Sequence, residues 1–248
     1  MTPPRAAAFA DLERSPLAGR ALSPTPYGAI ARSTKHFPDR PTLTFLSSGE
    51  PGGQALTLTY RQFLKEINRA ANALHDLGVQ PDDVVTLLPP NGPEYVPLLW
   101  GAQVAGVVNP VNPLLEAEHV AGLMRSAGSK VLVTLAPQSE LGLWEKALAI
   151  AGQVPSLQAI LTVGPAADPS LTGSPIPAAS LQDLTAAQPG TLTSEPSRDS
   201  QKVAALFHTG GTARPGGAGS LRRRLQPGDP DLMAARTSIP RPLLEGTP

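Results

Sequence analysis

The chain has no cysteine, few aromatic residues and no net formal charge across its 248 residues. Without cysteine it can form neither disulfides nor thiolate metal sites, and it has no thiol nucleophile, a composition typical of cytoplasmic proteins. The balance of charge argues against a protein that coats nucleic acid or an anionic membrane. Hydrophobic residues make up 41% of the chain and aromatic residues only 4%, so we expect a core of mainly aliphatic side chains.

Long apolar runs are also missing. The N-terminal segment reaches Asp11 and Glu13 after a short apolar run, which is not the pattern of a signal peptide. The most apolar region, Val84–Val111, contains Glu94 and several prolines, so it is not expected to span a bilayer. We therefore expect a cytoplasmic protein without integral membrane association and without a nucleic-acid partner.

What the chain does contain is a regular alternation of strand and helix patterns. Two β-rich runs, Thr42–Leu46 and Ala55–Thr59, flank a glycine-rich turn and predict a hairpin. Thr59 and Gln62 then form a capping-box pattern ahead of a helix whose apolar residues recur at i, i+3 and i+4. Gly78 follows at the position where a left-handed cap would end that helix.

Four further strands are predicted, and single helices separate them. The strands are expected at Val84–Leu88, Val107–Val111, Lys130–Leu135 and Leu157–Val163. The helices are expected from Pro93 to Ala105, from Glu116 to Ala127 and from Ser139 to Ile150. Strands joined by helical crossovers form a largely parallel sheet with helices on both faces, so the fold class is α/β.

The remaining segments have weaker patterns. Residues 1–40 are proline-rich and predict an extended arm with a short helix near Gly28–Phe37. Residues 164–200 are rich in Pro, Ser, Thr and Ala and predict a loose linker with a turn or two of helix after Ser180. Val203–Phe207 then predicts a buried strand that returns to the core.

A glycine-rich turn follows that strand. It consists of Thr209, Gly210, Gly211 and Thr212. Glycine-rich loops after a strand bind phosphate because their backbone N–H groups converge on the oxygens without Cβ atoms in the way. On these few residues alone, a tight turn between two strands is the simpler interpretation.

The order of several longer motifs favours the phosphate loop. The motifs are "LTYRQF", "LGVQPDDVV", "LPPNGPEYVPLLWGAQVAGVVNPVNP", "AGSKVLVT" and "FHTGGT". From Arg32 to Thr212 the chain resembles the N-terminal part of the adenylate-forming enzymes, the AMP-dependent acyl-CoA synthetases and their relatives. The last motif is most similar to fatty-acyl and aryl CoA ligases.

The resemblance implies that residues 1–212 are a partial N-terminal AMP-binding domain. Intact enzymes of this kind use ATP and Mg²⁺ to convert a carboxylic acid to an acyl-adenylate, and then transfer the acyl group to CoA. In them the motif that begins at Thr209 opens the loop around the ATP phosphates, and its usual wording continues as Thr-Gly-x-Pro-Lys. The resemblance therefore implies that Thr209–Thr212 bind the phosphates of ATP.

The chain departs from the family pattern directly after Thr212. Ala213 stands where a second threonine is usual, Arg214 where glycine is usual, Gly216 where proline is usual, and Gly217 where lysine is usual. The later adenine-stacking, ribose-binding and catalytic-lysine elements are absent as well. We therefore expect a chain that is truncated within its phosphate loop and inactive alone. Thr209–Thr212 would be a vestigial site, with no catalytic or metal-binding residues beside it.

Residues 213–248 have a different composition from the rest. They contain eleven Pro or Gly residues and a net charge of +3, and they offer few large side chains to bury, so we predict a disordered tail. The abrupt change resembles a change of reading frame. A second hypothesis is a non-catalytic interaction module, because a parallel sheet is normally covered on both faces. Its unfinished sheet would associate with a full-length ligase or a separately encoded remainder.

Several other residues are candidate sites. His208 is expected to be structural at a strand end and not to contact phosphate. Glu116, Glu118 and His119 are expected to form a solvated helix face and not a metal site. Arg222–Arg224 are expected to make only non-specific contacts. Trp100 and Trp144 are expected to pack in the core.

Overall fold

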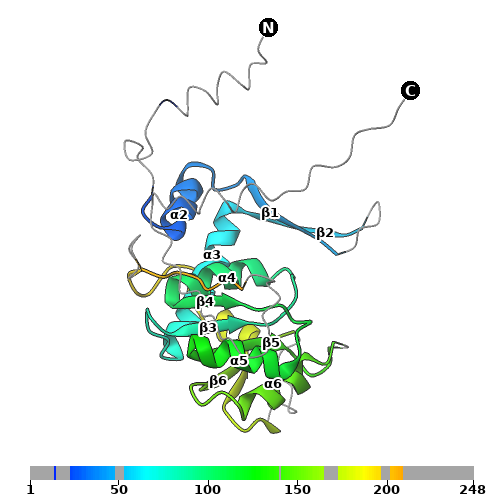
Figure 1. The fold of residues 1–248 in the computed structure, drawn as a ribbon. Helices are drawn as coiled ribbons and strands as arrows, with labels where there is room; N and C mark the ends of the chain where they lie inside the picture. The colour runs from blue at the N-terminus through cyan, green and yellow to red at the C-terminus, as the bar shows by residue number, and fades with distance from the viewer. Residues whose placement is uncertain are drawn as a thin grey trace, which may run out of the picture.

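The computed structural model describes residues 14, 23–47, 53–139, 141–164, 173–196 and 202–208. These residues form a two-stranded antiparallel hairpin and a five-stranded parallel sheet in the order β4-β3-β5-β6-β7. Figure 1 shows the hairpin projecting away from the sheet, beside the first described helix. The predicted α/β class is confirmed, whereas the predicted phosphate loop and tail lie outside the described residues.

The N-terminal elements are α2 (Pro26–His36), β1 (Pro41–Leu46) and β2 (Ala55–Thr59), which confirms the predicted short helix and hairpin. Thr25 caps α2 by accepting a hydrogen bond from the Gly28 amide, and proline at the first helical position has a φ angle suited to a helix. Apolar side chains of α2, β1 and β2 pack against Phe63 and Ile67.

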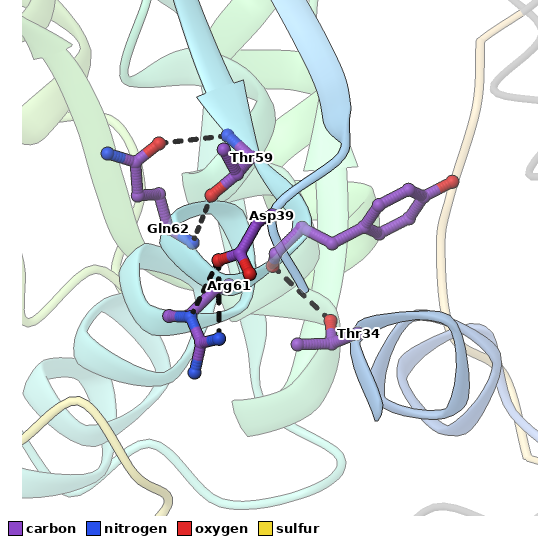
Figure 2. A network of polar contacts seen from close by, with 6 residues as sticks. Thr34, Asp39, Thr59, Arg61 and Gln62 are labelled. Carbon is purple, nitrogen blue, oxygen red and sulfur yellow. Dashed lines mark hydrogen bonds and ion pairs between the residues drawn. The ribbon is translucent and has the colours of Figure 1, made fainter. Parts of the chain in front are cut away.

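The helix α3 (Tyr60–Asp76) begins with the predicted capping box. The Thr59 hydroxyl accepts from the Gln62 amide at 3.3 Å, and the Gln62 side chain accepts from the Thr59 amide at 2.9 Å. Figure 2 shows this box beside the Arg61–Asp39 ion pair. Gly78 has a φ of +78°, the left-handed conformation that ends the helix as predicted.

The parallel sheet contains β3 (Val84–Leu87), β4 (Val107–Pro110), β5 (Ser129–Leu135), β6 (Ala159–Val163) and β7 (Ala178–Ser180). The helices between and after them are α4 (Tyr95–Ala105), α5 (Ala117–Ala127), α6 (Leu143–Ala151) and α7 (Leu181–Ala186). Side chains alternate between the two faces: Leu132 and Ile160 pack with α5 and α6, while Val131 and Leu161 pack with α3, α4 and α7. The sheet is therefore covered by helices on both faces, as predicted.

Two helices begin later than the sequence predicts. α4 starts at Tyr95 and not at Pro93, because Pro97 has no N–H to donate to the Pro93 carbonyl; the first such bond joins Leu98 to Glu94. α6 starts at Leu143 and not near Ser139. The Ser139 hydroxyl accepts from the Leu141 amide in a local turn, and the residue before the helix, Gly142, is left-handed.

The region predicted as a loose linker is more ordered than expected where the structure describes it. Ser180 caps α7 by accepting from the Asp183 amide, which confirms the short helix predicted after it. The three residues before α7, Ala178–Ser180, form the edge strand β7, which the sequence does not predict. Its sequence, Ala-Ala-Ser, lacks the β-branched residues on which a strand prediction depends. Within the described residues, no helix combines the length and the apolar character needed to cross a membrane.

Candidate functional site

The segment before the predicted phosphate loop lies beside β4. We call residues 202–208 the approach segment. The Val108 amide donates to the Ala204 carbonyl at 3.2 Å, and the Leu206 amide donates to the Val108 carbonyl at 2.8 Å. These two bonds form a single parallel bridge between Val108 and Ala205, so the approach segment runs in the same direction as the sheet strands.

The prediction of a buried strand at Val203–Phe207 is wrong. Its residues are at most partly buried, and Phe207 is 67% exposed. The segment also makes one bridge in place of a regular strand ladder, and the sequence of β4 explains this short pairing. Val107 and Val111 donate toward β3, so Val108 and Pro110 face the approach segment. Because Pro110 has no N–H, the ladder cannot continue beyond the Val108 bridge.

The direction of the approach segment decides where the loop begins. Since it runs parallel to β4, it carries His208 to the carboxyl-terminal edge of the sheet. In open α/β sheets, ligands bind outside the carboxyl ends of the strands. The four residues of the predicted site, Thr209, Gly210, Gly211 and Thr212, come next and lie outside the described residues. Their role as a phosphate loop remains a prediction.

A chain of polar side chains joins His208 to the interior of the sheet. His208 Nε2 lies 2.7 Å from Asn109 Oδ1, and Asn109 Nδ2 donates to Thr86 Oγ1 at 3.0 Å. Thr86 Oγ1 lies 2.7 Å from Ser129 Oγ. Asn109, Thr86 and Ser129 are fully buried and come from β4, β3 and β5. Buried polar groups of this kind are stabilising only when each has a partner, and this chain supplies one at every step.

The environment of His208 favours its neutral form. Partial burial lowers the pKa of His208, and the nearby His119 lowers it further. The part-buried hydrogen bond to an uncharged amide fits this, because Asn109 offers no negative charge to stabilise an imidazolium. The contact supports the structural role predicted for His208.

A second set of polar contacts holds residues 188–193, which we call the strap, against α3. The Asn72 side chain donates to the carbonyls of Pro189 at 3.3 Å and Thr191 at 2.8 Å. Its oxygen accepts from both the amide and the hydroxyl of Thr193, each at 3.1 Å. These four bonds use the full capacity of an asparagine side chain.

Asn68, one turn earlier on α3, completes this arrangement. It donates to the Gly190 carbonyl at 2.9 Å and accepts from the Tyr27 hydroxyl at 2.9 Å. Burial raises the pKa of Tyr27, and the bond to Asn68 partly offsets that rise. Gly190 lies so close to α3 that a Cβ atom there would come within 2.8 Å of the Lys65 side chain. The two asparagines thus join α2, α3 and the strap.

Neither set of contacts follows from the sequence pattern. The available signal was that Thr86 and Asn109 interrupt otherwise apolar strands, and that Asn68 and Asn72 lie among the apolar residues of α3. The partners of Asn68 and Asn72 in the strap are between 117 and 122 residues away, so the sequence pattern does not predict these bonds.

The other candidate residues are placed as follows. Trp144 is buried in the core as predicted, and Trp100 is partly buried against α3. Glu118 and His119 are exposed on α5. No group of three or more potential metal ligands occurs in the part of the chain that the structure describes. Arg222–Arg224 lie outside that part.

Known proteins are similar to this chain in sequence and in fold. Marinolic acid–CoA ligase of Pseudoalteromonas sp. (strain SANK 73390) is 33% identical over 153 residues, which is 62% of this chain and 23% of the relative. Crotonobetaine/carnitine–CoA ligase of Salmonella arizonae is 30% identical over 183 residues, 73% of this chain and 33% of the relative. The chain thus spans about a quarter to a third of the length of these relatives.

Among solved structures, an anthranilate CoA ligase in complex with anthranoyl-AMP matches with a TM-score of 0.63 and 23% identity. The match covers 81% of this chain and 35% of that chain, and it supports the fold. The family described as AMP-binding enzymes matches residues 30–217, which include all of the parallel sheet, the strap and the approach segment. The chain therefore belongs to the family of AMP-binding enzymes.

Proposed function

We propose that the chain is the N-terminal fragment of an acyl-CoA synthetase specific for a fatty or aryl acid, and that it is inactive alone. The supporting observation is the approach segment, which brings His208, the residue before Thr209, to the carboxyl-terminal edge of a parallel sheet. Its relatives are CoA ligases of which it spans only a part. In this proposal residues 1–212 are a partial adenylation domain and 213–248 a divergent tail.

The proposed loss of activity follows from the phosphate loop. Thr209–Thr212 match the family's motif sequence, whereas glycine stands at position 217, where the family has a lysine whose positive charge would face the phosphates. Hydrogen bonds to a charged acceptor are each worth about 1.5–3 kcal/mol, so the loss of several donors would leave a weak, vestigial site. In the intact enzyme, bound Mg²⁺ would offset charge on the departing pyrophosphate; no described residue is assigned to it.

The activity test uses the purified chain with ATP, Mg²⁺, CoA and a panel of fatty and aryl acids. We expect neither AMP nor acyl-CoA above the level of a no-enzyme control, with an intact CoA ligase as the positive control. Formation of either product by the chain would overturn the proposed inactivity.

The origin of the chain can be tested separately from its DNA. If the frame changes near Thr212, another frame downstream should encode Thr-Gly-x-Pro-Lys and continue as a ligase. A downstream sequence without ligase motifs in any frame would contradict the proposed truncation.

The alternative is a non-catalytic module that associates with a ligase or its remainder. The observation that favours it is the hairpin, where Leu46 and Leu56 are 61% and 48% exposed. The register pairs Leu56 with Phe45 and Leu46 with Ala55, so the two leucines lie on opposite faces of the hairpin, and each face offers a partner one exposed apolar side chain. Light scattering with and without a full-length ligase tests this. A chain that stays monomeric and binds neither a ligase nor its C-terminal part would exclude the alternative.

A further inference from the structure

A short pairing attaches the approach segment to the sheet. Two backbone hydrogen bonds join it to β4: the Val108 amide donates to the Ala204 carbonyl at 3.2 Å, and the Leu206 amide donates to the Val108 carbonyl at 2.8 Å. Beyond this bridge, His208 Nε2 lies 2.7 Å from Asn109 Oδ1. By contrast, β3 pairs with both β4 and β5, each over four residues. The described pairing of the approach segment is therefore much shorter than that of a sheet strand.

Apolar burial adds little to this attachment. Residues 203–206 are partly buried, and Phe207 is exposed. Ala205 packs against the cluster that contains Val108, but the side chain of an alanine is a single methyl group. The free energy gained from burial is roughly proportional to the apolar area removed from water, so separating the segment from the sheet costs little by this contribution.

The sheet beneath has its own contacts. β4 pairs with β3 along its whole length, from Val107 to Pro110. The side chain of Val108 is fully buried among residues of β3, α3 and α4. Asn109 has a second partner in the Thr86 hydroxyl, at 3.0 Å. Separation of the approach segment would therefore leave the pairing and the packing of the sheet in place.

We propose that the approach segment opens from β4 and closes onto it as a unit, while the parallel sheet stays folded. Segments with few buried contacts open locally at a free energy far below that of global unfolding. The contact between His208 and Asn109 favours the closed arrangement, because it fixes the end of the segment beyond the Val108 bridge. His208 reaches the carboxyl-terminal edge only in that arrangement, so a molecule that binds against His208 there would stabilise it. The inference rests on these contacts and not on the proposed function.

Amide hydrogen exchange of the intact chain, followed by NMR, tests the opening directly. Two adjacent amides of β4 form a matched pair: Val107 donates to the Asp83 carbonyl on the side of β3, and Val108 donates to the Ala204 carbonyl of the approach segment. We expect Val108 and Leu206 to exchange at least about tenfold faster than Val107, after correction for intrinsic rates, and to respond less to low concentrations of urea. A smaller difference, or the same urea response at all three amides, would show that the segment opens only with the sheet and would overturn the proposal.

A histidine variant tests whether the side-chain contact of His208 closes the segment. In His208→Ala we expect Val108 and Leu206 to exchange about fivefold faster than in the wild type, the effect of one net hydrogen bond, while Val107 is unchanged. The matched control is His36→Ala, which removes an exposed histidine of α2 and should change none of the three amides. If His208→Ala also changes none of them, the contact does not hold the segment closed. If it accelerates Val107 as much as Val108, the contact stabilises the whole sheet. Either result would overturn the proposal.

Discussion

The strap and the approach segment are attached to the body of the protein in different ways. Side chains hold the strap, where Asn72 alone makes four hydrogen bonds to residues 189–193. In the approach segment, backbone hydrogen bonds join Ala204 and Leu206 to Val108, and His208 is bonded to Asn109 at its end. In both segments a buried asparagine side chain, Asn72 or Asn109, bonds the segment to the body of the protein where a regular backbone ladder is missing or stops.

The strongest test of this comparison is Asn72→Ala. The substitution leaves the carbonyls of Pro189 and Thr191 and the amide of Thr193 without these partners. The strap residues Pro189, Thr191 and Thr193 are exposed, so their freed groups can bond to water. The loss then comes from four hydrogen bonds with a net worth of about 0.5–1.5 kcal/mol each, and we expect the free energy of unfolding to fall by about 3 kcal/mol. Urea unfolding measures it, with the exposed Asn91→Ala as control. A loss as small as that of the control would show that the strap is held by other means.

Asn68→Ala should have an intermediate effect. This residue makes one bond to the Gly190 carbonyl and one to the Tyr27 hydroxyl, and the hydroxyl lies close enough to the surface to find water more easily. We expect a loss of about 1.5 kcal/mol in the free energy of unfolding. Hydrogen exchange should show faster exchange in both α2 and the strap. If only one of them responds, Asn68 does not join the two.

Pro110→Val should strengthen the weaker attachment. The valine would supply an N–H facing the approach segment, and the parallel pattern set by Val108 places the Leu206 carbonyl as its acceptor. A net gain of about 1 kcal/mol should slow amide exchange at Phe207 and His208 several-fold in hydrogen-exchange mass spectrometry. The exchange of β3 serves as the internal control. Unchanged exchange in the approach segment would mean that something other than the missing N–H ends the ladder.

The smallest expected effect is on the dependence of stability on pH. The pKa of His208 is lowered by burial and by His119, so the unfolded chain binds more protons than the folded chain just below the ordinary histidine pKa. Stability should therefore fall as pH drops from above the unfolded pKa through the folded one. His208 is partly exposed, so solvent screening keeps this contribution small.

The measurement compares urea midpoints at pH 7.5 and pH 5.0 for the wild type and for His208→Gln. The variant should lose part of the destabilisation at low pH, whereas His36→Gln controls for the removal of a histidine elsewhere. An identical pH dependence in the wild type and in His208→Gln would contradict the cited shift.

Much of the fold could be predicted because its signals are local. The capping box at Thr59 and the left-handed glycine at Gly78 act within a few residues and occur as the sequence predicts. The errors arose where two local signals compete. Pro93 favours the start of a helix, but Pro97 removes the N–H that would bond to it. β7 consists of small residues whose strand form depends on pairing with β6.

The candidate site was less accessible to prediction. Sequence reasoning placed Val203–Phe207 in the core because its residues are apolar. The effect of Pro110, almost a hundred residues earlier, becomes visible only once β4 and the approach segment are side by side. Similarly, Thr86 and Asn109 are opposite each other only because β3 and β4 pair in that register. Long-range partners of single polar residues leave no pattern in the sequence.

The proline at the end of β4 has one further consequence, for self-association. Edge strands with unpaired N–H groups can template pairing with other chains and so start aggregation. On its outward side β4 has Val108, whose N–H is bonded to Ala204, and Pro110, which has none. In the described residues, the outward side of β4 therefore offers no free N–H group with which the edge of another chain could pair.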